Sequence, residues 1–201
     1  MKNLNPTEIQ VDYFRQLFKS LDYSFFEEGS YNLNIIAIRH NTNDNTFDDI
    51  MYIVFKDYQS KWKIYQFTIT TKAGAYYLLN PMNSQGTAIV VPGQYSKAYK
   101  LGYHKNYPAL VQDAPISVYR DKNKDIIHDL EPSSIQKGVY AINIHRASST
   151  GTSTKVDKWS AGCMVFSNIL EWNLFYATLL ESQKLYGDYF TFTLLEESQL
   201  K

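Results

Sequence analysis

Apolar and aromatic side chains near the start of the chain recur at the spacing of one helix face. They are Ile9, Tyr13, Phe14, Leu17, Phe18 and Leu21. Asn5 followed by Pro6 is a favourable helix start, because proline fits the first helical position. The pattern therefore predicts an amphipathic helix over residues 6–21.

Short apolar runs then follow one another, separated by clusters of Gly, Pro, Asn and Asp, which is typical of β-strands joined by turns. The predicted strands are residues 33–39, 51–56, 62–71, 76–79, 87–91, 116–120 and 139–144. The Tyr- and Lys-rich stretch 99–107 is interpreted as a loop.

The hydrophobic period changes again in the last part of the chain. Ser167 can cap a helix that runs to Tyr186, where Gly187 ends it, and residues 189–195 predict a final strand. Helices do not alternate with strands, which argues against a parallel α/β sheet. The predicted fold class is mainly β (α+β): an antiparallel β-sandwich or barrel with a helix near each terminus.

Length and composition favour one folded domain. The chain has 201 residues, of which 44% are hydrophobic and 20% charged, so it can bury a substantial core. We expect a single domain over 1–201, in which an N-terminal helical segment, 1–30, packs on the remainder, 31–201.

The formal net charge is zero, but the charges are unevenly distributed. Residues 51–160 hold 14 basic and 7 acidic side chains, a net charge of +7. A positive groove there would attract an anionic substrate such as a carboxylate-rich peptide, although the opposite charges of the chain could equally meet within the fold. No dense Lys/Arg cluster with interleaved aromatics is present, so nucleic acid is not an expected partner.

The N-terminus lacks the apolar core of a secretory signal, and no run reaches transmembrane length. The sequence therefore predicts a chain that is cytoplasmic as synthesised, without stable membrane insertion.

Cys163 is the only cysteine, which excludes an internal disulfide and makes a poor zinc site with the few histidines nearby. The stretch 121–125 resembles a calcium loop only superficially, because the glycine and glutamate that such a loop needs are Ile126 and Pro132. We predict no metal and no cofactor. Cys163 is then either a nucleophile with a base or a buried small hydrophobe.

His145 is the candidate base. It ends an apolar run, a polar loop over 147–158 follows, and the chain returns at Ser160-Ala161-Gly162-Cys163. Such a loop can bring two strand ends together, so that the imidazole accepts the thiol proton. Gly162 permits close backbone approach, and N–H groups near Cys163 could stabilise an oxyanion.

The histidine, the spacer 146–159 and the Ser-x-Gly-Cys sequence resemble the catalytic domain of L,D-transpeptidases, whose signature is His-Gly, a similar spacer, then Ser/Thr-His-Gly-Cys. This resemblance implies that Cys163 is the nucleophile and His145 the general base. It also implies that the carbonyl of Arg146 orients the imidazole, and that Ser160 and Gly162 shape the turn and the oxyanion site.

The stretches 92–95, 102–104, 107–112, 118–121, 142–146 and 156–163 are similar to a phage and prophage subgroup of that family, and the resemblance covers about residues 35–195. It implies an L,D-transpeptidase-like catalytic domain over 31–201, an endolysin-like role on the peptidoglycan stem peptide, and access to the wall through a separate holin-type protein.

Three positions depart from the family signature: its second histidine is Ala161, the polar residue after the cysteine and its hydrophobic neighbour is Val165, and the glycine after the first histidine is Arg146. These losses favour hydrolysis over transpeptidation. The predicted reaction is cleavage of an L,D peptide bond, diaminopimelate to D-Ala, through an acyl-enzyme. L,D-transpeptidation and a non-catalytic wall-binding or virion structural protein with a vestigial site remain alternatives.

Three residues, His104, Tyr103 and Trp159, are substrate-binding candidates in addition to Arg146. His104 and its neighbour Tyr103 could contact a substrate carboxylate, although a histidine there could also be a simple turn residue. Trp159 could wall the groove or pack in the core. Arg146 could pair with a substrate carboxylate or form an internal salt bridge.

Overall fold

Eleven β-strands and three α-helices make up most of the computed structural model, which describes residues 6–42 and 45–200. Residues 1–5 of the predicted N-terminal segment lie outside the described part. The helices are α1 (Pro6–Ser20), α2 (Ala75–Leu79) and α3 (Ile169–Tyr186). The strands are β1 (Asn34–Arg39), β2 (Asp49–Lys56), β3 (Trp62–Thr70), β4 (Thr87–Val90), β5 (Gly93–His104), β6 (Tyr107–Gln112), β7 (Ile116–Asp121), β8 (Gln136–Gly138), β9 (Ile144–Arg146), β10 (Met164–Phe166) and β11 (Tyr189–Glu196).

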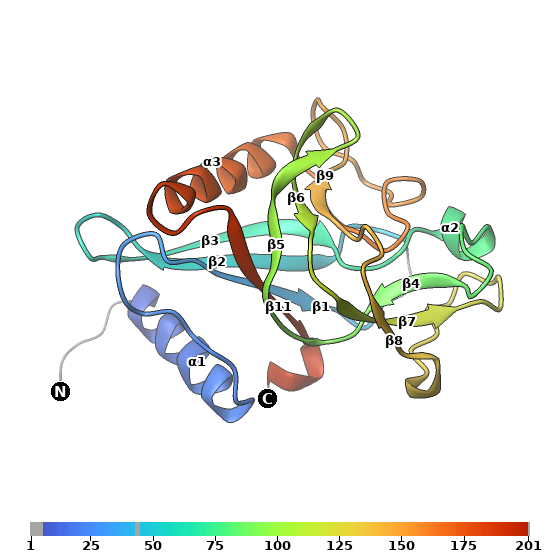
Figure 1. Cartoon of the computed structure of the whole chain (residues 1–201), viewed down its shortest axis with the longest axis horizontal. Coiled ribbons are helices and arrows are strands. Elements are labelled where there is room, and N and C mark those ends of the chain that lie inside the picture. The colour runs from blue at the N-terminus through green and yellow to red at the C-terminus, as the bar shows by residue number, and fades with distance from the viewer. Residues whose placement is uncertain (1–5, 43–44, 201) are drawn as a thin grey trace.

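Eight of the strands close into a barrel in the order β1-β11-β5-β6-β9-β10-β3-β2, and β4-β7-β8 form a separate three-stranded sheet (Figure 1). The prediction of a mainly β fold is thus confirmed. The pairs β1–β11 and β9–β10 are parallel, whereas the other neighbouring strands of the barrel are antiparallel. The barrel is thus mainly antiparallel, as predicted, with two parallel pairs that the sequence did not indicate.

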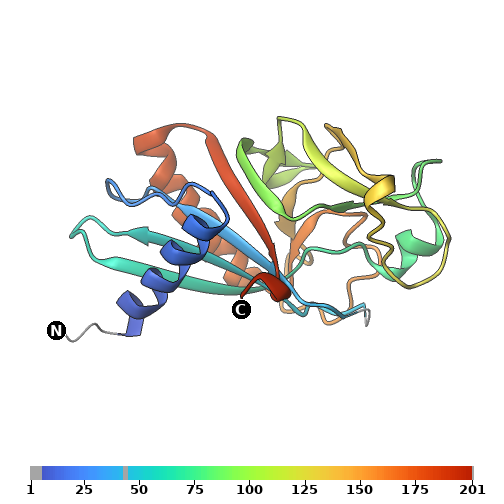
Figure 2. The ribbon, with the colours of Figure 1, turned by 90° about the horizontal axis from the view of Figure 1, so that it is seen from below.

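The strand β1 separates two apolar layers, because successive side chains of a strand point to opposite faces. Ile36 and Ile38 face α1, whose Val11, Phe14 and Phe18 are buried against them. Ile35 and Ala37 belong to the other cluster, with Trp172, Phe175 and Leu179 of α3. Figure 2 shows α1 and α3 on opposite sides of the strands.

The start of α3 differs by one residue from the predicted cap. Asn168 is the N-cap, and its side chain accepts hydrogen bonds from the backbone N–H groups of Leu170 and Glu171. Ser167 instead donates its N–H to the carbonyl of Thr68 on β3, so it still belongs to the barrel wall. Gly187 ends the helix as predicted, with a positive φ of 81°.

Two predicted strands are wrong. Residues 76–79 fall in the helix α2. Within 139–144, only the last residue belongs to a strand, β9. The physical reason is a side chain: the amide oxygen of Gln112 accepts the N–H groups of Tyr140 and Ile142, which would otherwise need a neighbouring strand.

The predicted loop over 99–107 is also wrong, because it lies in the long hairpin of β5 and β6. Lys105 and Asn106 form the two-residue connection between the paired residues His104 and Tyr107. Alternating Tyr, Lys and Gly give no apolar periodicity here, and Pro108 lowers strand propensity. The pairing comes from barrel closure, since β5 and β6 lie between β11 and β9.

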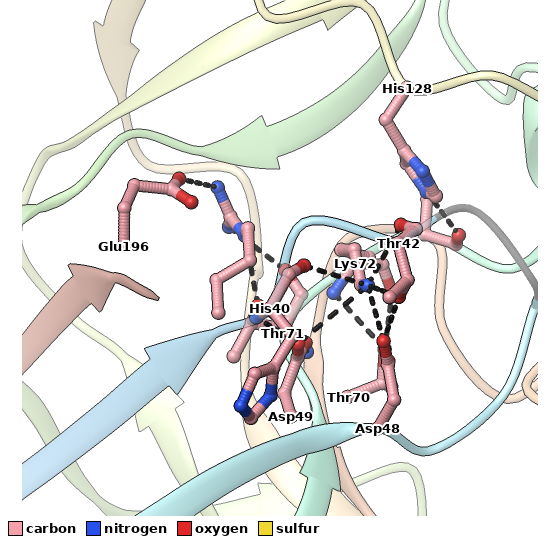
Figure 3. A network of polar contacts seen from close by, with 11 residues as sticks. His40, Thr42, Asp48, Asp49, Thr70, Thr71, Lys72, His128 and Glu196 are labelled. Carbon is pink, nitrogen blue, oxygen red and sulfur yellow. Dashed lines mark hydrogen bonds and ion pairs between the residues drawn. The ribbon is translucent and has the colours of Figure 1, made fainter. Parts of the chain in front are cut away.

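A buried polar network joins the ends of β1, β2 and β3 (Figure 3). The carboxylate of Asp49 is fully buried and accepts hydrogen bonds from the N–H of His40 at 2.9 Å and from the N–H and hydroxyl of Thr71 at 2.6 and 2.7 Å. Arg39 donates to the same Thr71 hydroxyl, and Lys72 lies 3.7 Å from the Asp49 carboxylate. These contacts fix the chain just after β3.

The segment fixed in this way supports the turn that carries Cys163. Gly74, two residues after Lys72, donates its N–H to the carbonyl of Ser160 at 2.9 Å. Gly74 has no room for a side chain, since a Cβ atom would lie 2.1 Å from the carbonyl oxygen of Asp157. The backbone from Thr71 to Gly74 thus connects the network to the turn.

Replacing Asp49 with Asn should lower the free energy of unfolding by about 3 kcal/mol, because it leaves the buried Arg39 and Lys72 with too little negative charge. Urea denaturation measures the change, and Glu131→Gln, at an exposed position, is the charge-matched control. A loss for Asp49→Asn no larger than that of the control would contradict the importance of the network.

Candidate active site around Cys163 and His145

The parallel pairing of β9 with β10 places Cys163 and His145 on one face. Ile144 lies beside Met164 and His145 beside Val165, and the N–H of Met164 donates to the carbonyl of Asn143 at 3.0 Å. Extending this register backwards puts Cys163 beside Asn143. Because side chains two apart along a strand share a face, Cys163 and His145 are diagonal neighbours.

Both side chains line a pocket of about 650 Å³ between the barrel and the three-stranded sheet. His104 and Trp159 also line it, together with the backbone stretch 139–142. Cys163 is 8% exposed, so the thiol lies at the inner wall of the pocket. A pocket of this volume suits a small molecule or a short peptide.

The hydrogen bonds of His145 assign its neutral tautomer. Nδ1 lies 2.8 Å from the carbonyl oxygen of Arg146, and since a carbonyl only accepts, Nδ1 carries the proton. The hydroxyl of Tyr107 lies 3.1 Å from the same nitrogen. Nε2 is buried and has no hydrogen-bond partner among the described residues. Nε2 is therefore the ring atom left to act as a base.

A second imidazole stacks on the first. The rings of His104 and His145 are parallel within 8°, with centroids 4.1 Å apart. Asn143 holds His104: its Oδ1 accepts the N–H of Gln112, so its amide nitrogen donates to Nδ1 of His104 at 3.1 Å. His104 is thus unprotonated at Nδ1, and the two stacked rings are both neutral.

The turn before Cys163 is held by Ser160. Its hydroxyl donates to the carbonyl of Cys163 at 2.8 Å and accepts the N–H of Gly162 at 3.1 Å. Gly162 has a φ of 122°, and a Cβ there would lie 2.3 Å from the carbonyl oxygen of Ala88. Both residues shape the turn, but the Gly162 N–H is already engaged and is not a free oxyanion donor.

Burial keeps both candidate groups uncharged. It raises the pKa of the Cys163 thiol from 9.0 to about 11. It also lowers the pKa of His145 to about 3, with a further contribution from the neighbouring His104. Sγ accepts the N–H of Asn143 at 3.4 Å and lies 3.8 Å from the carbonyl oxygen of Ala141. The resting site is a neutral thiol beside a neutral imidazole, not an ion pair.

The other sequence-predicted residues divide into two groups. His104 and Trp159 reach the pocket, and Trp159 is 43% exposed, which makes it a wall rather than a core residue. Tyr103 is 71% exposed and is not among the pocket-lining residues. Arg146 packs its guanidinium over the Tyr107 ring at 4.2 Å and donates to the carbonyl of Ala147, away from the pocket lining.

Sequence reasoning missed three residues that support the site. Tyr107 contacts Nδ1 of His145, Asn143 holds His104, and the Gln112 amide also donates to the carbonyl groups of Ala114 and Gly138. The signal that could have found Gln112 and Asn143 is a polar residue beside an apolar run. Gln112 and Asn143 are only 7% and 8% exposed, because their side-chain amides bond to backbone groups that would otherwise need a neighbouring strand.

Among the described residues, no group of three or more His, Cys, Asp or Glu side chains is placed to hold a metal ion. A membrane-crossing helix is not found in the described part of the chain either.

Comparison with protein-family models, with curated proteins and with solved structures gave no match. The resemblance to L,D-transpeptidases has no support from these comparisons.

Iodoacetamide should modify Cys163 slowly at neutral pH, with a rate that keeps rising up to about pH 11, because only the thiolate reacts. The urea-unfolded chain, in which the thiol regains its ordinary pKa of 9.0, should reach its plateau at lower pH. A plateau below pH 8 in the folded protein would contradict the neutral resting thiol.

The stability contributed by a neutral His145 should fade in acid. The unfolded chain binds a proton at this residue below pH 6.5, whereas the folded chain does so only near pH 3. The advantage of the wild type over His145→Gln should thus shrink by about 1.4 kcal/mol per pH unit as the pH falls from 6.5 toward 3. Urea unfolding at several pH values measures it, and a constant difference would contradict the buried, neutral imidazole.

Proposed function

We propose that this protein is a cysteine peptidase that hydrolyses an L,D peptide bond of the peptidoglycan stem peptide through an acyl-enzyme. The observation that carries the proposal is the placement of Cys163 and His145 on one face of two paired strands, inside a pocket, where the Nε2 atom of His145 has no hydrogen-bond partner in the described part of the chain. Burying an imidazole nitrogen without a hydrogen-bond partner destabilises the fold, and a catalytic role would explain why this cost is retained.

The first chemical step forms a thioester. Sγ of Cys163 attacks the scissile carbonyl carbon, and its proton passes to Nε2 of His145 as the S–C bond forms. Since the resting pair is neutral, this transfer accompanies the attack rather than preceding it. Collapse of the tetrahedral intermediate breaks the C–N bond, and the leaving amine takes the proton from Nε2.

The second step releases the product. A water molecule gives one proton to Nε2 and attacks the thioester carbonyl, and the S–C bond breaks as the proton returns to sulfur. The carbonyl of Arg146 holds the Nδ1–H throughout and so keeps the ring in the tautomer that can accept a proton at Nε2.

The substrate class follows from the pocket and from the resemblance of the His/Cys motif. The pocket can hold a few residues of a stem peptide, and Trp159 offers an aromatic wall at its mouth. The bond between diaminopimelate and D-Ala is the proposed point of cleavage. In this proposal the protein is made in the cytoplasm and reaches the wall after a separate holin-type protein opens the membrane.

A second candidate is a non-catalytic wall-binding or virion protein. The observation that favours it is the Sγ atom itself, which contacts the backbone of Asn143 and Ala141 and has a pKa raised to about 11. In that case the Cys163 thiol would serve only as a buried packing group.

Purified diaminopimelate-type sacculi distinguish the candidates. The wild type should release shortened stem peptides, Cys163→Ala should release none, and His145→Gln should be slower by about a hundredfold or more, in the range of general-base catalysis. Lys124→Met, at an exposed loop position, is the control that should match the wild type. Equal products from the wild type and Cys163→Ala would overturn the thiol mechanism, and new crosslinks instead of shortened stems would indicate transpeptidation.

A further inference from the structure

The charges around the pocket are of one sign. Lys105, Arg120 and Lys158 line it together with the two stacked histidines, and none of the described residues that line it is an aspartate or glutamate. The three cations come from three separate parts of the chain: the tip of the β5–β6 hairpin, the strand β7 and the loop before Trp159. Converging on one cavity from different elements, they form a positive wall.

None of these three cations is in an ion pair with a carboxylate in the described part of the chain. Six cations outside the pocket do pair with acidic side chains. They are Arg15, Arg39, Lys63, Lys72, Lys100 and Lys184. The three pocket cations thus converge on one cavity without a carboxylate partner among the described residues.

Two of the pocket cations are held in place by uncharged groups. The Arg120 guanidinium lies 4.5 Å from the Tyr140 ring centre and donates to the Gln136 side chain at 3.0 Å and to the Gly86 carbonyl at 3.3 Å. The Lys158 ammonium lies over the Tyr76 ring at 4.3 Å. Aromatic faces and carbonyls orient a cation without cancelling its charge, so it stays available to an anionic ligand.

Lys105 is the pocket cation that acts electrostatically on both candidate groups. Burial has the largest effect on the pKa of His145 and of Cys163, and the positive charge of Lys105 lowers both pKa values. It occupies the hairpin tip with a positive φ of 56°, one residue after the stacked His104. The hairpin that holds the histidine stack thus also brings a positive charge to the thiol.

We propose that Arg120, Lys158 and Lys105 form a carboxylate-binding subsite, which selects acyl substrates with free carboxylates beside the scissile bond. This inference rests on the proposed function for the identity of the substrate as a stem peptide. The subsite itself is a property of the pocket and can be tested without turnover.

The test measures peptide binding to Cys163→Ala by isothermal titration calorimetry. The probes are a stem tetrapeptide with free carboxylates and the same peptide with every carboxylate amidated. The free acid should bind at least about tenfold more tightly, since a charge-assisted hydrogen bond is lost in the amide. Lys158→Met and Lys105→Met should each weaken binding of the acid by about tenfold and leave binding of the amide unchanged.

Lys137→Met is the matched control: Lys137 is exposed on β8, lies outside the pocket lining and should change neither affinity. Equal affinities for the two peptides, equal effects of Lys158→Met on both, or no binding of the acid would overturn the subsite. Binding of the acid without cleavage by the wild type would overturn the proposed function and support the subsite. Cleavage of both peptides at equal rates would support the function and overturn the subsite.

Discussion

The pairing of β9 with β10 is the constraint on which the candidate site depends. Each strand has only three residues, yet their parallel register puts Cys163 and His145 on one face. A shift by one residue would turn the thiol to the opposite face and separate the pair. Hydrogen bonds hold this register on both strands. Before β10, the Ser160 hydroxyl bonds to Gly162 and Cys163, and before β9, the Asn143 side chain accepts the N–H of Gln112.

Support for this pair comes from parts of the chain that are remote in sequence. The polar network around Asp49 fixes the segment that bonds to Ser160, and Gln112 replaces a missing strand partner along the pocket wall. The hairpin of β5 and β6 contributes the stacked His104. Polar side chains, rather than a continuous sheet, therefore shape the cavity in front of the thiol.

The spacing of apolar residues was enough to predict the helices and strands that have a clear periodicity of their own. The helix α1 and the strands β1 to β3 have clear apolar periodicity, and Gly187 marks the end of α3. The hairpin of β5 and β6 has no such pattern, because its partners come from barrel closure. The thiol and imidazole were likewise visible as a spaced pair. Asn143 and Gln112 stand out locally only as polar residues beside apolar runs, and their partners lie in distant segments that no local pattern identifies.

The central claim is that Cys163 and His145 act together in acyl transfer. Mass spectrometry of the protein mixed with a stem tetrapeptide and quenched in acid tests it most directly, because a thioester survives acid. If Cys163 and His145 act together, an acyl mass should be added to the peptide that contains Cys163. This adduct should form much more slowly in His145→Gln and be absent in Cys163→Ala. No adduct in the wild type, with cleaved peptide accumulating at the same time, would contradict it.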